Sequence, residues 1–322
     1  MPQRTPNYMY DRQQLPPVSV SIVVPAYDEA EALRDVVDEY RSVGDEIVVV
    51  DDGSGDGTAA IADDLGGIDG VVVRHHDTNR GKAHALRTGV EAATGDVVVF
   101  TDADTTYPAD AVPALLERLD GGADLVLGSR LMDGGGANIP RTNRIGNRLL
   151  TFLVSIVGGV SITDAQTGLR AMRRDRFDEL DPRDAVNLEF ETRMTARAAK
   201  KGYRVEEIPI EYRERVGETK LKPVRDGYRM FRAIVDTVFE EATPPVRVSV
   251  GLSVLLFFAG SYTGLVSVVS TITTGDIQHD FYPLLTVFFF IVAFQLFVVV
   301  LIADQIKHRI DRLDEEIQAV RD

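Results

Sequence analysis

The stretch VVVFTDAD, residues 97–104, decides the fold, because an apolar run is followed at once by two carboxylates. A short continuous apolar run is typical of a strand that is buried on both faces, as in a parallel sheet covered by helices. Open sheets of this kind bind ligands outside the carboxyl ends of their strands. The stretch therefore predicts an α/β domain and the end of its sheet where a site forms.

The segments on either side continue an alternation of strand and helix. Apolar β-branched runs and helical periodicity predict strands at 18–24, 46–50, 71–74, 96–101 and 125–128, and helices at 30–40, 58–65, 83–93 and 111–119. This order implies a mainly parallel sheet with helices on both faces. Carboxylates and turn residues follow three of these strands, at 25–29, 51–57 and 102–108.

Asp102 and Asp104 indicate a metal site. Their spacing at a strand end lets both carboxylates approach one position as the chain turns, and carboxylates so close repel each other. A hard divalent cation relieves the repulsion, and Mg²⁺ typically binds one or two protein carboxylates together with phosphate oxygens and water. The ordinary alternative is a solvated turn. The position after a buried strand favours a Mg²⁺ or Mn²⁺ site that receives a diphosphate.

The glycine-rich stretch DDGSGDGT, residues 51–58, has two interpretations. It could be a turn followed by Thr58 as the N-cap of a helix, or a loop that cradles phosphate. The chain has neither a GxGxxG motif nor a Walker GK[ST] motif here, so neither a dinucleotide-binding fold nor a P-loop is supported. Asp51 or Asp52 could instead accept a hydrogen bond from a base N–H or a ribose hydroxyl.

The composition excludes several classes of protein. The 322-residue chain has no Cys, which excludes disulfide frameworks, thiolate metal centres and thiol nucleophiles. Its 35 Lys and Arg against 50 Asp and Glu give a net charge of −15, which argues against a nucleic-acid partner. The acidic excess fits an ordinary acidic protein or a halophile surface, and its spread through nearly every expected helix favours the second, as in a haloarchaeal protein.

Two apolar segments without charged residues, 248–272 and 281–303, predict a C-terminal transmembrane helical hairpin. Each is long enough to cross a hydrocarbon core of ~30 Å as a helix. Arg247 precedes the first segment and cations at 307–312 follow the second, whereas the connection carries no Lys or Arg. The positive-inside rule then predicts a cell-membrane protein whose catalytic domain and termini are cytoplasmic. The alternative is a buried helical hairpin of a soluble protein.

Segments 143–160 and 224–238 have the periodicity of amphipathic helices with cations on the polar side. Either could pack in a core, but the neighbouring apolar segments favour the membrane surface, where 143–160 would guide a lipid tail. The expected organisation is a flexible segment at 1–17, an α/β catalytic domain at 18–222, an interfacial helix at 223–243, membrane helices at 248–272 and 281–303, and a cytoplasmic tail at 304–322.

Six short motifs occur in the order of a known enzyme family. They are PAYDE at 25–29, DDGS at 51–54, NRGK at 79–82, DAD at 102–104, GSR at 128–130 and TDAQTG at 163–168. Together they resemble the GT-A fold glycosyltransferases of family 2, and over about residues 18–230 the chain is similar to the dolichyl-phosphate hexose synthases. DADTTYPAD at 102–110 and LKPVRDG at 221–227 look like the archaeal dolichyl-phosphate glucosyltransferases of protein N-glycosylation.

The resemblance implies roles for individual residues. The nucleotide-sugar would contact Pro25, Ala26, Tyr27, Glu29, Asp51, Asp52, Lys82 and Asp102. Asp102 and Asp104 would hold Mg²⁺ or Mn²⁺ against the diphosphate, and with Asp164 and Gln166, near the sugar or acceptor, they would be the catalytic residues.

The resemblance is not complete at two positions. Asp28 stands where many relatives have Asn, and Thr106 stands where some synthases have Gln beside the metal. An acidic protein that handles phosphate also needs a local group of cations. The expected contacts to the acceptor phosphate are Arg130, Arg144, Arg215 and Lys220, the last two on a loop that the resemblance places over the site.

The expected reaction is the inverting, metal-dependent transfer of a hexose, glucose from UDP-glucose, to dolichyl phosphate. The acceptor is already anionic near about pH 7, so no strong base is needed, and His75 and His76 are expected to be structural. The alternatives are a dolichyl-phosphate mannose synthase that uses GDP-mannose, a sugar nucleotidyltransferase that releases pyrophosphate, and a membrane-anchored binding protein with an inactive site.

Overall fold

The computed structural model describes residues 18–134, 138–187, 189–216, 244–274, 282–296 and 298–299. The chain divides into two compact units, Met1–Thr237 and Val238–Asp322. The predicted segments 1–17, 223–243 and 304–322 lie outside the described residues, and so does Lys220.

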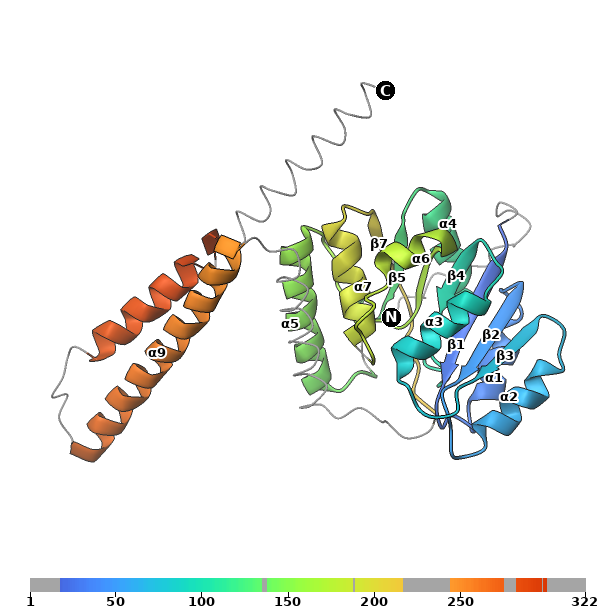
Figure 1. Ribbon diagram of the computed structural model, residues 1–322, viewed down its shortest axis with the longest axis horizontal. Helices are drawn as coiled ribbons and strands as arrows, with labels where there is room; N and C mark the ends of the chain where they lie inside the picture. The colour runs from blue at the N-terminus through green and yellow to red at the C-terminus, as the bar shows by residue number, and fades with distance from the viewer. Residues whose placement is uncertain are drawn as a thin grey trace, which may run out of the picture. The chain divides into compact units, whose positions relative to one another are not determined.

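A seven-stranded sheet forms the centre of the first unit, with strand order β3-β2-β1-β4-β6-β5-β7 (Figure 1). The strands are β1 (Val20–Ala26), β2 (Glu46–Asp51), β3 (Val71–His75), β4 (Val97–Phe100), β5 (Leu125–Ser129), β6 (Arg170–Arg173) and β7 (Val205–Pro209). Every pairing between neighbours is parallel except those of β6, which runs antiparallel to β4 and β5. The mainly parallel sheet that the sequence predicts is therefore confirmed, with one reversed strand.

Helices cover both faces of this sheet. They are α1 (Leu33–Tyr40), α2 (Thr58–Gly66), α3 (Lys82–Ala92), α4 (Val112–Asp120), α5 (Arg141–Gly158), α6 (Phe177–Leu180) and α7 (Glu189–Lys200). Because side chains alternate along a strand, Ile22 of β1 belongs to the core under α1, α2 and α4, whereas Val23 belongs to the core under α3, α6 and α7. Burial on both faces explains why these strands are continuously apolar.

Helix α5 differs from the other described helices of this unit because its exposed side carries large apolar residues. It lies beside α7 in Figure 1, and a Cβ at Gly158 would come within 2.2 Å of Ala199 Cβ, so these helices pack closely. Ile145, Leu149 and Phe152, spaced along another stripe of α5, are 70%, 58% and 59% exposed. The amphipathic helix predicted at 143–160 is thus present, with large apolar side chains on its open face.

The second unit contains α9 (Pro244–Thr274) and a shorter apolar helix, Tyr282–Leu296. Thr263 Oγ1 and Thr286 Oγ1 are 2.8 Å apart, and the ring centroids of Phe257 and Phe290 are 5.4 Å apart. Residues later in α9 contact residues earlier in the second helix, so the two helices run antiparallel. Within the described residues, one stretch, Gly251–Thr273, is long and apolar enough to span a membrane. The predicted second span, 281–303, is only partly described.

We expect Gly89→Ala to destabilise the first unit. Gly89 lies on α3 over β1, and an added Cβ would come within 2.3 Å of Val23 Cγ1. Overpacking of this kind typically costs about 1–3 kcal/mol of unfolding free energy. Gly146→Ala on α5 is the matched control, because nothing lies within 4 Å of its Cβ position and removing a helical glycine stabilises by about 0.5–1 kcal/mol. Equal melting temperatures for the two variants would contradict the packing.

Candidate active site

One edge of the sheet collects the predicted site. β1, β2, β4, β5 and β7 all end there, because they run in the same direction. β6 runs the opposite way, so the segment that leads into it, 163–168, also reaches this edge. The TDAQTG motif therefore contacts residues that follow β4 and β5, at Asp102 and Arg130.

Arg215 joins three of these segments. Its Nη1 lies 3.2 Å from Asp104 Oδ2, and its Nη2 pairs with Glu29 Oε1. Asp104 is 5% exposed. Burial raises the pKa of the Asp104 carboxyl, and the charge of Asp102 raises it further, against the opposing effects of a Thr106 hydrogen bond and Arg215. The structure thus brings Glu29, Asp104 and Arg215 together at one sheet edge, and their roles toward donor, metal and acceptor stay predictions.

The loop after β4 is held in a fixed conformation. Thr106 donates to Asp104 Oδ1 from both Oγ1, at 2.5 Å, and the backbone N–H, at 3.2 Å. The segment after β7 runs alongside, with Arg213 N donating to Thr106 O at 3.0 Å and Val216 N donating to Asp104 O at 3.3 Å. The Thr106 hydroxyl therefore orients the Asp104 carboxylate, and its predicted place beside a metal stays a prediction.

Asp102 pairs with a basic side chain of its own. Lys82, the first residue of α3, places its Nζ 2.5 Å from Asp102 Oδ1 and 2.6 Å from Glu191 Oε1. Burial alone would lower the pKa of Lys82, but the two carboxylates outweigh it and raise the pKa above its usual range. On the other side, a Cβ at Gly168 would come within 2.9 Å of Asp102 Oδ2. The TDAQTG motif thus packs against the Asp102 carboxylate at Gly168, where a larger residue would clash.

The loops after β1 and β2 bind each other through reciprocal hydrogen bonds. Asp28 N donates to Ser54 Oγ at 2.9 Å, and Gly55 N donates to Asp28 Oδ1 at 2.8 Å. Asp28 has φ of +49°, a conformation that Asn and Asp adopt more readily than most residues. Glu29 N donates to Thr58 Oγ1 at 2.8 Å. The predicted N-cap role of Thr58 is wrong, because α2 begins at Thr58 and its hydroxyl faces the other loop.

Asp51 and Asp52 are both buried and both engaged within the protein. Asp52 accepts from Arg80 N at 2.9 Å and Gly81 N at 2.8 Å, and its Oδ1 lies 2.6 Å from His76 Nδ1. Asp51 accepts from Ser54 N at 3.2 Å, and His75 Nδ1 lies 3.2 Å from its Oδ2. These bonds order the loops before α2 and α3 and agree with structural histidines. Contact of either aspartate with a base or ribose stays a prediction.

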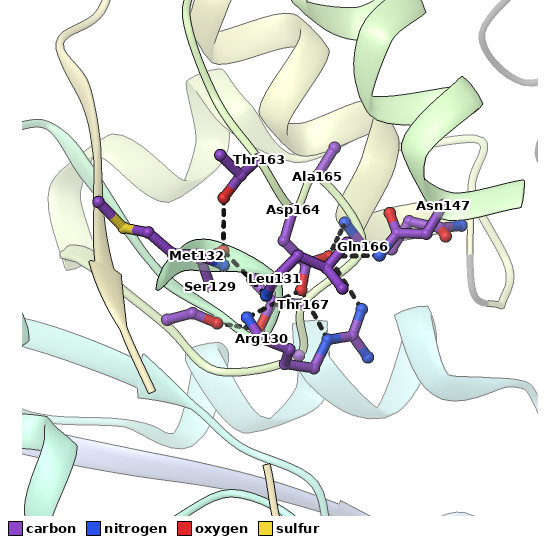
Figure 2. A network of polar contacts seen from close by, with 12 residues as sticks. Ser129, Arg130, Leu131, Met132, Asn147, Thr163, Asp164, Ala165, Gln166 and Thr167 are labelled. Carbon is purple, nitrogen blue, oxygen red and sulfur yellow. Dashed lines mark hydrogen bonds and ion pairs between the residues drawn. The ribbon is translucent and has the colours of Figure 1, made fainter. Parts of the chain in front are cut away.

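Arg130 and Asp164 form a buried ion pair (Figure 2). Arg130 donates from Nε to Asp164 Oδ2 at 2.7 Å and from Nη2 to Oδ1 at 2.9 Å, and Asn147 Nδ2 donates to Oδ1 at 2.7 Å. Burial alone would raise the pKa of Asp164, but Arg130 and these hydrogen bonds hold it below its usual range. With 0% exposure, Asp164 orients Arg130 and does not face solvent.

The remaining predicted residues lie around this pair or at the open edge. Gln166 N donates to Asp164 Oδ1 at 3.3 Å, and Arg144 Nη2 donates to Ile139 O at 3.2 Å. The Arg130 guanidinium also lies 5.3 Å from the ring centroid of Tyr212. Pro25 and Ala26 end β1, and Tyr27, which follows them, is 36% exposed.

Comparison with known proteins agrees with this geometry. The sequence profile of glycosyl transferase family 2 matches residues 21–181, half of the chain. The chain belongs to glycosyl transferase family 2. It is therefore a glycosyltransferase, and the predicted membership is confirmed.

Curated relatives match about two thirds of this chain. A "Dolichyl-phosphate hexose transferase" of Haloferax volcanii is 35% identical over 225 residues, 69% of this chain and 95% of that protein. "Glycosyltransferase AglJ" of the same organism is 34% identical, over 67% of this chain and 70% of that protein. The "Polyprenol monophosphomannose synthase" of Mycolicibacterium smegmatis is 32% identical, over 66% and 84%.

Solved structures confirm the GT-A fold of this family 2 enzyme. Glucosyl-3-phosphoglycerate synthase from Mycobacterium tuberculosis, crystallised with Mn²⁺, UDP and phosphoglyceric acid, matches with a TM-score of 0.54 at 20% identity. The match covers 70% of this chain and 78% of that one. The same enzyme has been crystallised with Mg²⁺ and UDP. At this identity the likeness concerns the fold.

Four further residues of the family 2 site were not predicted from the sequence. Glu191 pairs with Lys82, and Glu207 accepts from Asp164 N at 2.9 Å and from Thr163 N at 2.7 Å. Tyr107 OH accepts from Gly168 N at 2.7 Å, and the Tyr107 and Tyr212 rings pack edge to face. Tyr107 lies within the DADTTYPAD run, whereas the other three lie outside the quoted motifs. No sequence signal distinguishes Glu191, because α7 carries several charged residues and Arg193 and Lys200 on it are buried as well.

The donor set of Asp102 and Asp104 fits a divalent cation. Repulsion between the two carboxylates contributes to the raised pKa of Asp104, and bound Mg²⁺ or Mn²⁺ would relieve it. The described residues form no cluster of three or more His, Asp or Glu that could hold a metal. Two carboxylates, with phosphate oxygens and water for the other positions, match the way Mg²⁺ binds in phosphate-transfer sites.

Proposed function

We propose that this enzyme transfers a hexose, glucose from UDP-glucose, to dolichyl phosphate for protein glycosylation, with inversion at C1 and dependence on a divalent metal. The observation that carries the proposal is the meeting of Asp102 and Asp104 with the cations Lys82 and Arg215 at one sheet edge. Such a set can hold a metal-bound diphosphate on one side and an anionic acceptor on the other. The dolichyl-phosphate hexose transferase relative supports the acceptor.

The donor half of the site is formed by the first two βα loops and the loop after β4. Pro25, Ala26, Tyr27 and Glu29 would line the nucleotide pocket, and Asp51, Asp52 and Lys82 would complete it. Asp102 and Asp104 would hold Mg²⁺ or Mn²⁺, which supplies charge neutralisation of the departing nucleoside diphosphate. The hydrogen bonds that connect the two loops keep this pocket in place before the donor arrives.

The acceptor half needs cations more than it needs a base. A phosphate monoester is anionic near about pH 7 and can attack C1 directly. Asp164 is buried and paired with Arg130, so its function is to orient that guanidinium beside Gln166. Arg130, Arg144, Arg215 and Lys220 would then bind the acceptor phosphate.

The acceptor lipid implies attachment to a membrane. We infer that α9 and the helix that begins at Tyr282 cross the membrane as a hairpin over 248–272 and 281–303, with the catalytic domain and both termini in the cytoplasm. The apolar composition and antiparallel packing of the two helices support this. The exposed apolar stripe of α5 would contact the lipid surface, where the dolichyl chain stays in the bilayer.

A second candidate donor is GDP-mannose. The "Polyprenol monophosphomannose synthase" of Mycolicibacterium smegmatis and the "Dolichol-phosphate mannosyltransferase" of Pyrococcus furiosus, at 32% and 30% identity, favour it. Both donors place a diphosphate on the same carboxylates and differ in base and hexose. The chemistry at Asp102 and Asp104 is therefore the same for either.

The test is incubation of the purified full-length protein with dolichyl phosphate, Mg²⁺ and radiolabelled UDP-glucose or GDP-mannose, followed by lipid extraction. Label from UDP-glucose in the lipid fraction is the expected result. Label from GDP-mannose alone would establish the second candidate. Absence of lipid label, together with release of pyrophosphate when a nucleoside triphosphate and a hexose 1-phosphate are supplied instead, would indicate a nucleotidyltransferase and overturn the proposal.

Acid should weaken metal use before it unfolds the protein. The pKa of Asp104 is raised, so its carboxylate becomes protonated at a higher pH than an ordinary Asp, and the protonated form cannot bind a metal. The apparent Mn²⁺ constant for transfer should rise as pH falls through this raised pKa, and excess Mn²⁺ should restore the rate. An apparent constant that stays flat between about pH 4 and pH 7 would contradict this.

A further inference from the structure

Lys82 stands between two carboxylates that come from different parts of the fold. Its Nζ is 2.5 Å from Asp102 Oδ1, after β4, and 2.6 Å from Glu191 Oε1, on α7. The Glu191 side chain is 4% exposed, and its Oε2 accepts no hydrogen bond from the described residues. The buried Arg170 also interacts electrostatically with Glu191, and a buried carboxylate is costly unless its cationic partners stay in place.

Backbone contacts fix the start of α3 against the segment that leads into α7. Ala83 N donates to Val186 O at 3.0 Å. Gly81 has φ of +95°, and a Cβ there would come within 2.4 Å of the same Val186 oxygen. The Lys82–Glu191 pair is therefore set by the packing of two helix starts. Asp102 joins this pair from the sheet.

A divalent cation on Asp102 competes with the Lys82 ammonium for the same oxygen. The Asp102 carboxylate cannot turn away freely, because Gly168 lies against it so closely that a Cβ there would be 2.9 Å from Oδ2. The Lys82 ammonium must therefore move away from Asp102 Oδ1 when the metal is bound. Without another anion it would stay as a partly buried cation beside a dication, which is strongly unfavourable.

We propose that Glu191 is a positioning residue that retains Lys82 when Asp102 binds the metal. This inference rests on the metal-dependent transfer proposed above. In the metal-free form Lys82 is shared between the two carboxylates, and in the loaded form it pairs with Glu191 alone, at the edge of the diphosphate site. Glu191 thereby makes metal binding more favourable without contacting the metal or the substrates.

The test is titration of the purified full-length protein with Mn²⁺ alone, read from the electron paramagnetic resonance signal of the free ion. Glu191→Gln should weaken Mn²⁺ binding by roughly 10–100-fold, as removal of residues that support metal ligands generally does. Glu179→Gln, an equal loss of charge at a half-exposed ion pair on α6, is the control and should bind Mn²⁺ as the wild type does.

The same substitution in a Lys82→Met background separates retention of Lys82 by Glu191 from direct attraction of the metal by the Glu191 charge. With the ammonium gone, adding Glu191→Gln should no longer weaken binding, and the double variant should bind Mn²⁺ at least as tightly as the wild type. Equal weakening in both backgrounds, or wild-type affinity for Glu191→Gln, would overturn the inference. If Glu191→Gln alone does not fold, the double variant, which removes a matched pair, is compared with Lys82→Met. Weaker Mn²⁺ binding by the double variant would then overturn the inference. Failure of the wild type itself to bind Mn²⁺ would instead remove the metal from the proposed function.

Discussion

Asp104→Asn is expected to lower the rate of hexose transfer by about 10²–10³-fold at saturating donor and acceptor, the size of effect seen when one fixed electrostatic group is lost from a transition-state site. The amide keeps the shape of the side chain and its hydrogen bond from Thr106, but it removes the charge that would hold the metal. The loss should appear in kcat, because the charge on the departing diphosphate develops in the transition state.

The same substitution should stabilise the metal-free fold near neutral pH. A raised pKa means that ionised Asp104 is disfavoured in the folded state relative to the unfolded one, so this group's unfavourable contribution is present above the raised pKa and fades below it. A neutral amide avoids it. Asp110→Asn, at an exposed position of the same connection, is the control and should change neither rate nor melting temperature. A fast but destabilised Asp104→Asn enzyme would contradict both expectations.

The sheet edge and its strand-end acids follow from the sequence for a physical reason. A parallel strand buried on both faces is continuously apolar, so the polar residue that ends it is conspicuous, and parallel strands end at one edge. Glu29, Asp51 and Asp104 are therefore expected at the same sheet edge from the sequence alone. Strand β4 and the paired acids after it are the clearest case, because four apolar residues are followed within four positions by two carboxylates.

The residues that hold those acids could not be found in the same way. β6 has the sequence RAMR, with an arginine at each end. Arg170 is nevertheless only 1% exposed, and it donates to Thr167 O and Glu191 O. A buried arginine with backbone acceptors has no sequence pattern, because its partners are chosen by tertiary contact. The partner of Lys82 was missed for this reason, and so was the pairing of Arg130 with Asp164.

Asp164→Asn is the second substitution with a large expected effect, and its effect is on stability. It removes the only charge that neutralises Arg130 within the bidentate pair, while Asn147 and the Arg130 backbone still direct donors at the same position. Breaking a buried ion pair by removing one partner typically costs about 3–5 kcal/mol.

The unfolding free energy of the full-length protein should therefore fall sharply in Asp164→Asn, as measured by denaturant titration. Glu206→Gln, which disturbs pairs with the exposed Arg118 on α4 and Arg204 just before β7, is the control and should lose no more than about 1 kcal/mol. Because the cost arises from an uncompensated Arg130 charge, the double variant Arg130→Met, Asp164→Asn should recover stability but not transfer. A double variant as unstable as Asp164→Asn would show that the aspartate matters through its hydrogen bonds and not through its charge.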